Sequence, residues 1–392
     1  MSELSLPEPD ENALAHSQRV ADAVASKIEQ HGPLPFAEYM HLVLYGGGLG
    51  YYVSGNETFG ATGDFVTAPE TSPLFGHCLA HQIMEVLTEV PGDVLEIGAG
   101  SGVLALTLLL TLREEQQLPG RYLILEPSAV LQSRQAILLR QILPEDVFER
   151  VSWVSALPEQ FEGVVIANEV LDAMPVEQFQ LDPTTGEITQ VYVTLSDKGL
   201  VTVNDSPQPG LLAAVEHIRT TSQLDWSPGF RSEVNLHITG WIAALGASLK
   251  RGLVLLLDYG APRAELYGPA RYEGTLRCFY RHRVHGDALL YPGLQDVTAD
   301  VDFTAIAEAT VPAGLDLHGY TSQAAFLLNT GLLDFSDSAE HMKEADRLKV
   351  SQEIQRLTSP EAMGERFQVM GLSRGLDIEL AGFAGPDYTR RL

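Results

Sequence analysis

The sequence predicts an α/β protein built on a mostly parallel sheet of seven strands, with a helical cover at the N-terminus and an inserted subdomain. Three observations predict this class. Short and almost continuously apolar runs indicate strands that are buried on both faces. These runs alternate with segments of helical periodicity, and a glycine-rich turn directly follows the first run.

The first 90 residues are predicted to form an acidic tail and a helical cover. Within residues 14–30, Val20, Val24 and Ile28 recur at helical spacing, and a Gly-Pro pair at Gly32 ends that pattern. Further helices are expected over residues 35–44 and 73–90.

Residues 91–178 and 231–392 are predicted to form the sheet domain. Its strands are expected at residues 93–98, 121–127, 151–154, 163–167, 253–257, 315–320 and 367–372. Its helices are expected at residues 103–115, 129–141, 236–250, 303–310 and 338–357. Residues 179–230 are predicted to be an inserted subdomain with a hairpin that turns at Asp182. Residues 259–300 are expected to be irregular.

The charge excludes one large class of partner. The chain of 392 residues has 25 Lys and Arg against 52 Asp and Glu, a net charge of −27. Nucleic-acid binding requires a cationic surface, so no nucleic-acid partner is expected. Two explanations of the negative net charge stay open: it attracts a cationic substrate, or it reflects adaptation to a host with high salt.

The compartment is expected to be the cytoplasm. The two cysteines cannot build a disulfide framework, and the N-terminus lacks both the apolar core of a signal peptide and the basic character of a presequence. The longest apolar run is far shorter than the roughly 20 residues that span a membrane, so no membrane span is expected.

The glycine-rich turn reads Glu96-Ile97-Gly98-Ala99-Gly100-Ser101-Gly102, and the next glycine of the dinucleotide-binding pattern is replaced by Val103. With this spacing the turn resembles the first motif of class I S-adenosylmethionine-dependent methyltransferases. The resemblance implies that Glu96, Gly98, Gly100 and Gly102 hold the amino-acid part of this cofactor. The alternative is a tight structural turn.

Four further positions are expected beside the cofactor. Glu126 ends the second predicted strand, where a carboxylate can accept both ribose hydroxyls. Ser155 and Ala156 follow the third strand and would line the adenine pocket by analogy with the same class. Asn168, at the end of the fourth strand, is also expected to contact the cofactor.

Carboxylates follow the fourth strand, where that class places the methyl acceptor. Glu169, Asp172 and Glu177 lie within nine residues of one another. Carboxylates can hold a guanidinium in bidentate fashion, so Glu169 and Glu177 are predicted to orient an arginine substrate, with Asp172 as an alternative partner. The alternative is that Asn168 caps backbone groups while Glu169 and Asp172 cap the next helix. His282 and His285 have the spacing of metal ligands, but their segment is cationic and no metal is expected.

Several short segments of the chain form a recognisable set. They are Phe36-Ala37-Glu38-Tyr39-Met40, Gly50-Tyr51-Tyr52, residues 63–70, Ser72-Pro73-Leu74-Phe75-Gly76, residues 168–173, Glu233-Val234-Asn235, Asp258-Tyr259-Gly260, Tyr291-Pro292-Gly293 and Val301-Asp302-Phe303. Together these segments resemble the MidA family of methyltransferases. The resemblance covers about residues 20–375. Asp300 departs from it, because a histidine is expected there.

The resemblance implies S-adenosylmethionine as cofactor and methyl transfer to a protein arginine. The mitochondrial member of the family acts in assembly of respiratory complex I, so a complex I subunit or another protein is the expected substrate. Gly63, Asp64, Phe65 and Thr67 are implied to lie against the cofactor. Methylation of a small molecule and a cofactor-binding assembly chaperone with little turnover stay open, as does a homodimer.

Overall fold

The computed structural model describes residues 6–54, 67–335, 343–359 and 363–392. The chain forms two compact units. The first comprises Met1–Phe65, Asp172–Ile238 and Arg263–Asp300, and the second comprises Val66–Leu171, Thr239–Pro262 and Val301–Leu392. Each is described in turn below.

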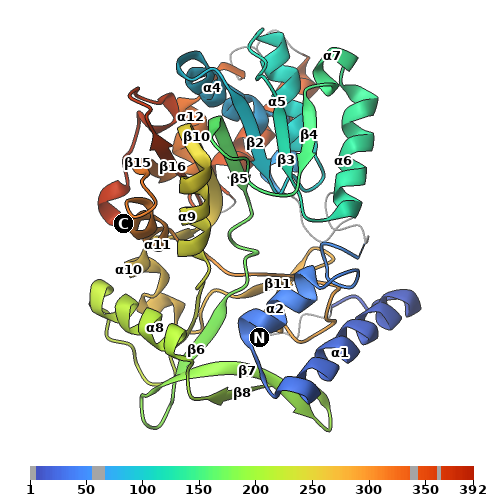
Figure 1. Ribbon diagram of the computed structural model, residues 1–392, viewed down its shortest axis with the longest axis vertical. Helices are drawn as coiled ribbons and strands as arrows, with labels where there is room; N and C mark the ends of the chain where they lie inside the picture. The colour runs from blue at the N-terminus through green and yellow to red at the C-terminus, as the bar shows by residue number, and fades with distance from the viewer. Residues whose placement is uncertain (1–5, 55–66, 336–342, 360–362) are drawn as a thin grey trace. The chain divides into compact units, whose positions relative to one another are not determined.

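The second unit is built on the predicted sheet (Figure 1). Its strands are β2 (Asp93–Ile97), β3 (Tyr122–Leu125), β4 (Val151–Val154), β5 (Phe161–Asn168), β10 (Leu249–Ala261), β15 (Asp316–Ser322) and β16 (Phe367–Arg374). They lie in the order β15-β16-β10-β5-β2-β3-β4, with the short β14 (Val301–Asp302) beside β10. The five strands from β10 to β4 are parallel, and β16 runs antiparallel to both of its neighbours. The prediction of seven mostly parallel strands is confirmed.

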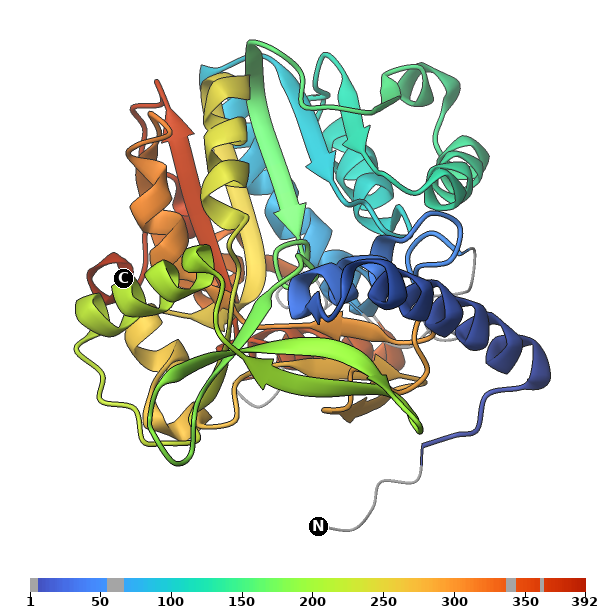
Figure 2. The same ribbon diagram turned by 60° about the horizontal axis from the view of Figure 1, so that its bottom comes forward.

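Helices cover both faces of this sheet. They are α3 (Ala68–Thr71), α4 (Pro73–Glu89), α5 (Val103–Glu114), α6 (Ala129–Ile142), α7 (Glu145–Phe148), α9 (Ile238–Ser248), α11 (Phe303–Thr310), α12 (Gln323–Asn329) and α14 (Glu344–Thr358), with short 3-10 turns at Ala381–Phe383 and Thr389–Arg391. Figure 2 shows α9 on one face and α4 and α5 on the other. Leu79 and Ile83 of α4, Leu108 of α5 and Ile166 of β5 are fully buried in one core. Within the described ranges, no helix is long and apolar enough to cross a membrane.

One arginine at the end of β16 joins two helix ends. The Arg374 guanidinium donates hydrogen bonds to the carbonyls of Gly246 (2.6 Å) and Leu249 (2.7 Å), at the end of α9. It also donates to the carbonyls of Ala313 and Gly314 (both 2.8 Å), after α11. Carbonyls at a helix C-terminus have no partner within their own helix, and this one cation satisfies two at the end of α9 together with two in the turn that follows α11.

Replacing Arg374 with methionine is therefore expected to destabilise the protein. Loss of the charged hydrogen bonds should lower the free energy of unfolding by about 2–3 kcal/mol. The measurement is urea unfolding followed by circular dichroism, with Arg113→Met, at an exposed position of α5, as the matched control. Equal stability of the two variants would contradict this role for Arg374.

The first unit contains a five-stranded sheet and, among its described residues, three longer helices. Its strands are β1 (Leu34–Pro35), β6 (Glu177–Leu181), β7 (Ile188–Ser196), β8 (Gly199–Asp205) and β9 (Arg231–Val234), and its longer helices are α1 (Glu11–His31), α2 (Phe36–Tyr45) and α8 (Pro209–Ser222). The predicted hairpin is confirmed, because Leu181 of β6 pairs with Ile188 of β7 and the Asp182 carboxylate accepts the amides of the turn. Val20, Val24 and Ile28 of α1 are buried, as their spacing predicts.

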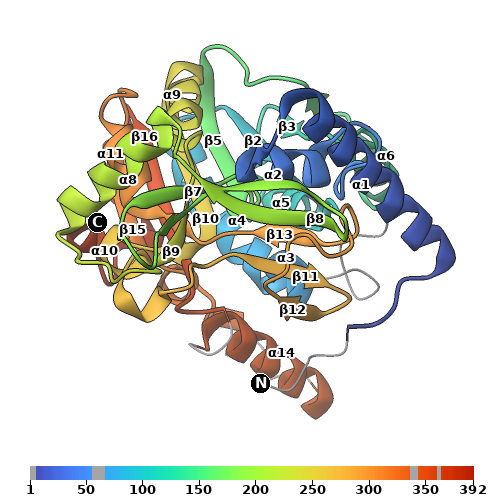
Figure 3. The same ribbon diagram turned by 90° about the horizontal axis from the view of Figure 1, so that it is seen from below.

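Residues 259–300 are more regular than the sequence indicated. In the first unit they form the short helix α10 (Arg263–Leu266), a 3-10 turn (Pro269–Arg271) and a small sheet of β11 (Arg277–Tyr280), β12 (Arg283–His285) and β13 (Asp296–Thr298), visible in Figure 3. The prediction of an irregular stretch was wrong because these strands have three or four residues and carry charges, so no apolar run marks them.

Asp300 is an ion-pair centre in the first unit. Its side chain is 2 % exposed and pairs with the guanidinium groups of Arg271 and Arg277, the latter at 3.1 Å. Asp300 also donates its backbone N–H to the hydroxyl of Thr275 (3.0 Å). At the position where the resemblance leads us to expect a histidine, a buried carboxylate thus pairs with two arginines of this segment.

The two units divide the chain differently from the expected boundaries of 1–90, 91–178 with 231–392, and 179–230. Residues 66–90 belong to the unit with the large sheet, because α4 packs into its core. Residues 172–178 and 263–300 belong to the other unit. An amphipathic pattern indicates that a helix has an apolar face but not which core that face joins.

Candidate active site

The turn between β2 and α5 contains three glycines with left-handed backbone conformations. Gly98, Gly100 and Gly102 have φ of 68°, 52° and 84°, a region that side chains disfavour. A Cβ atom on Gly98 would lie 2.9 Å from Cγ2 of Val170. At its three glycines the turn therefore exposes backbone without side chains. It ends at the N-terminus of α5, where backbone amides can face a bound ligand.

Glu96 lies beneath this turn rather than at the surface. Its side chain is buried, and the Tyr122 hydroxyl donates a hydrogen bond of 2.6 Å to Oε2. Burial raises the pKa of Glu96 to about 7, although the hydrogen bond from Tyr122 lowers it. The carboxyl group thus titrates near neutral pH.

This pKa predicts a specific dependence of stability on pH. The folded state keeps the Glu96 proton up to about pH 7, whereas the unfolded chain releases it near 4.5. Stability therefore falls as the pH rises between these values. Glu96→Gln cannot ionise, so its stability relative to the parent should grow by up to about 3 kcal/mol from pH 4 to pH 8. Urea unfolding at both pH values measures this, and a difference that does not change with pH would contradict it.

Glu126 follows β3 and is held by the start of the next helix. Its Oε1 accepts the Ser128 amide (3.0 Å), and its Oε2 accepts the side-chain amide of Gln135 (3.2 Å). Burial raises the pKa of Glu126, and hydrogen bonds from Ser128, Gln135 and the Gly100 backbone lower it. A carboxylate has about four acceptor sites, so Glu126 retains capacity for a hydroxyl donor.

Gln135 is a buried residue of this site that the sequence analysis missed. It lies on α6 between Leu131 and Leu139, and all three side chains face the core. Its side-chain nitrogen also donates to the Gly100 carbonyl (2.9 Å), so Gln135 joins the glycine turn to Glu126. The available signal was a polar residue at a position where the helical period calls for an apolar one.

Of the other residues expected to contact the cofactor, the structure describes Ser155, Ala156 and Thr67 in addition to Asn168. Ser155 and Ala156 are exposed in the bend after β4. Thr67 is the N-cap of α3 and forms a capping box with Glu70. Gly63, Asp64 and Phe65 lie outside the described residues.

Asn168 and Glu169 end β5 at the same edge of the sheet. Glu169 has a φ of 52°, which is unusual for a residue with a side chain. Its Oε1 accepts the Ala68 amide (3.4 Å) and the Asn168 side-chain amide (3.3 Å). The buried Oδ1 of Asn168 has no hydrogen-bond partner among the described residues. A buried polar atom of this kind usually has a partner, so a ligand group fits here.

Asp258, at the same edge on β10, braces the loop that carries Glu169. Its Oδ2 accepts the amides of Val170 (3.1 Å) and Leu171 (2.8 Å), and the Glu169 amide donates to the Leu257 carbonyl (2.9 Å). Main-chain donors of the loop are thus satisfied by β10. The strained backbone at Glu169 is stabilised by the strand beside it.

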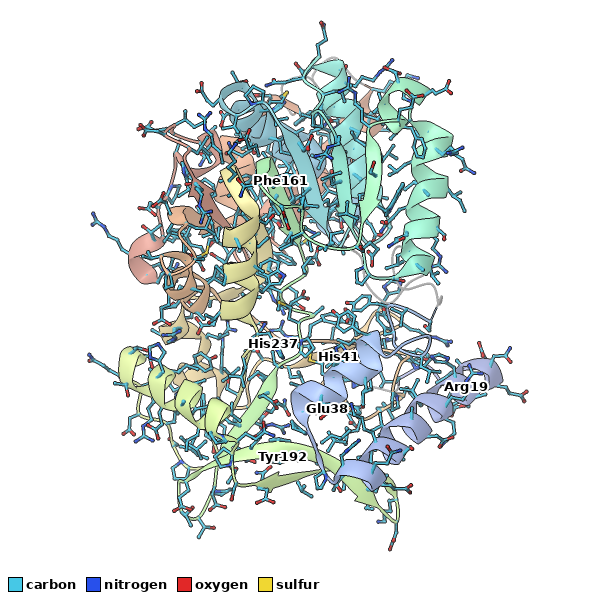
Figure 4. The ribbon with its side chains drawn as sticks, in the orientation of Figure 1. Arg19, Glu38, His41, Phe161, Tyr192 and His237 are labelled. Carbon is cyan, nitrogen blue, oxygen red and sulfur yellow. The ribbon has the colours of Figure 1, made fainter. Side chains whose placement is uncertain are left out.

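Asp172 and Glu177 belong to the first unit, where both are buried. The Glu177 carboxylate accepts the Ala37 amide (3.4 Å), in the first turn of α2, and the Gln190 side chain (3.1 Å). Burial raises the pKa of Glu177, the hydrogen bonds from Ala37 and Gln190 and the charge of His237 lower it, and the charge of Glu38 raises it. His237 and Glu38 both belong to the first unit and are labelled in Figure 4. Glu177 therefore accepts a backbone amide in the first turn of α2, a role that the sequence did not predict for this residue.

The histidines at 282 and 285 do not form part of a metal centre in the described ranges. There, no three His, Cys, Asp or Glu side chains are grouped as metal ligands would be. Burial lowers the pKa of His285.

The fold and the glycine turn define a class I S-adenosylmethionine-dependent methyltransferase. The glycine turn, Glu126 and Asn168 lie at the carboxyl ends of adjacent parallel strands, the edge at which open α/β sheets bind their ligands, and the buried Oδ1 of Asn168 has no partner among the described residues.

The comparisons with known proteins agree. A family model described as "Putative S-adenosyl-L-methionine-dependent methyltransferase" matches residues 78–321, and this chain belongs to that family. A protein from Burkholderia thailandensis, crystallised with S-adenosyl-homocysteine, is 40 % identical with a TM-score of 0.92, covering 99 % of this chain and 100 % of its own. S-Adenosylmethionine is the cofactor, and the expected enzyme class is confirmed.

Curated relatives carry a more specific name. The mitochondrial "Protein arginine methyltransferase NDUFAF7" of Homo sapiens is 29 % identical, over 93 % of this chain and 85 % of its own length. Its homolog in Drosophila melanogaster is 28 % identical, over 94 % and 88 %. The resemblance stated from the sequence motifs is therefore confirmed.

The expected cytoplasmic location is corrected by these relatives, which are named as mitochondrial proteins. The expectation depended on cysteine usage and on the composition of the N-terminus. Neither property measures location, because a reducing compartment is not specific to the cytoplasm.

Proposed function

We propose that this protein is a protein-arginine N-methyltransferase. The observation that carries the proposal is Glu169, a carboxylate in a left-handed backbone conformation at the end of β5, fixed by the Ala68 amide and the Asn168 side chain. Strain of this kind is retained where the surrounding structure imposes it, often at functional sites. The names of the curated relatives support the same acceptor.

In this proposal the cofactor site is formed by the glycine turn and the strand ends beside it. Gly98, Gly100 and Gly102 leave room for the amino-acid part, and Glu126 accepts the ribose hydroxyls. Asn168 offers its buried oxygen to the ligand. The bound cofactor supplies an electrophilic methyl group, and the chain's task is to position it and the acceptor.

Glu169 is proposed to hold the guanidinium of the substrate. A carboxylate binds two N–H groups of a guanidinium in parallel and so fixes the orientation of the third nitrogen. Glu177 already accepts an amide of α2, and Asp172 is buried, so Glu169 is assigned the main role and the other two remain secondary candidates. The net charge of −27 favours a cationic substrate.

The test is transfer of isotopically labelled methyl groups into an extract of cells that lack the protein. Label in the protein fraction is expected, with a respiratory complex I subunit as the first candidate to examine. Label only in small metabolites would favour the small-molecule alternative. Clear cofactor binding without any label would favour an assembly chaperone and would contradict the proposal.

A further inference from the structure

Gln135 makes three side-chain hydrogen bonds inside the second unit. It is fully buried on α6. Its nitrogen donates to the Gly100 carbonyl (2.9 Å) and to Oε2 of Glu126 (3.2 Å), and its oxygen accepts the indole N–H of Trp153 on β4 (2.8 Å). One side chain therefore links the turn after β2, the acid after β3 and the strand β4.

Trp153 determines which way this amide faces. An indole nitrogen can only donate, so the side-chain oxygen of Gln135 must face it. Both N–H groups then face the acceptors at Gly100 and Glu126. The reverse orientation would place an oxygen against a carbonyl and a carboxylate and leave the half-buried indole N–H without this acceptor.

The backbone around Gln135 leaves little freedom for another arrangement. A Cβ atom on Gly102 would lie 3.2 Å from Cγ of Gln135 and 3.4 Å from its Cα. The glycine turn thus packs directly on the Gln135 stem, while the amide reaches past it to Gly100 and Glu126. Packing holds Gln135 against the glycine turn, and hydrogen bonds join it to the same turn and to Glu126.

We propose that Gln135, oriented by Trp153, is a positioning residue that aims the Glu126 carboxylate at the ribose of the cofactor. Ser128 holds one oxygen of Glu126 and Gln135 holds the other, so the carboxylate cannot rotate away. The inference rests on the proposed assignment of Glu126 to the ribose and is independent of the methyl acceptor.

The test compares two ligands by calorimetry, S-adenosylhomocysteine and its analogue lacking both ribose hydroxyls. Gln135→Met keeps a similar volume but cannot donate. The variant should bind S-adenosylhomocysteine about tenfold more weakly, the loss expected for one charged hydrogen bond. Its affinity for the analogue should change far less, so discrimination between the two ligands should shrink. A packing role alone would weaken both ligands equally and would overturn the proposal.

Gln132→Met is the matched control, because Gln132 lies on the same helix but donates to the backbone carbonyl of Glu126 (2.6 Å). Its discrimination should equal that of the parent; a loss equal to that of Gln135→Met would overturn the specific role. Should Gln135→Met not fold, Trp153→Phe removes only the orienting donor. That variant should also lose discrimination, and unchanged discrimination would overturn the proposal.

Glu126→Gln separates this inference from the assignment beneath it. Loss of discrimination in Glu126→Gln but not in Gln135→Met would refute the positioning role and leave the ribose assignment intact. Unchanged discrimination in both variants would refute the assignment as well.

Discussion

Glu169→Gln is expected to lower the rate of methyl transfer to protein by at least about 100-fold, the size of effect seen when one charge-positioning group is removed from an active site. Glutamine keeps the shape of the side chain and an oxygen that can accept the Ala68 amide. It cannot bind a guanidinium through two anionic oxygens. Affinity for S-adenosylmethionine should therefore stay within about threefold of the parent.

The measurements are the initial rate of labelled methyl transfer and calorimetric binding of the cofactor. Glu145→Gln is the matched control, since Glu145 is exposed on α7, ahead of β4 and away from the carboxyl ends of the strands. It should transfer methyl groups as fast as the parent. Parental activity in Glu169→Gln would refute the proposed guanidinium contact.

Gly100→Val is expected to abolish measurable cofactor binding, which corresponds to a loss of at least about 100-fold in affinity. Gly100 has a φ of 52°, and a β-branched residue is a strong outlier in that region. Its side chain would also occupy space at the glycine turn. The backbone would have to move, and the ligand would lose the bare turn that it approaches.

Gly240→Val makes the same exchange on α9, where an added Cβ atom would have no neighbour within 4 Å. This control should bind S-adenosylhomocysteine normally. Thermal unfolding of both variants shows whether each is folded, and Gly100→Ala provides a milder change at the same position. Unchanged binding in folded Gly100→Val would rule out the glycine turn as the cofactor site.

The regular elements around the sheet were predictable because each has a strong local signal. β2 and β5 are buried on both faces and read as apolar runs. The N-caps Ser72, Ser128 and Asp302 mark the starts of α4, α6 and α11. Strands such as β12, with exposed charged residues, have no such signal and were missed.

The chemistry of the site was only partly predictable. The glycine turn, Glu126 and Glu169 follow strand ends, so their shared edge follows from the topology of a parallel sheet. The helix-capping role of Glu177 joins residues 37 and 177, and the bond of Gln135 to Trp153 joins α6 to β4. Contacts of this kind depend on tertiary packing. A single sequence has no local pattern that indicates them.

Amino-acid analysis of the labelled protein product tests the central claim most directly. After methyl transfer from labelled S-adenosylmethionine into extract protein, the product is hydrolysed and its amino acids are separated. Label that co-elutes with N-methylated arginine, and that is lost with Glu169→Gln but kept with Glu145→Gln, is the predicted result. Label in another amino acid, or none in protein while the cofactor still binds, would contradict the account.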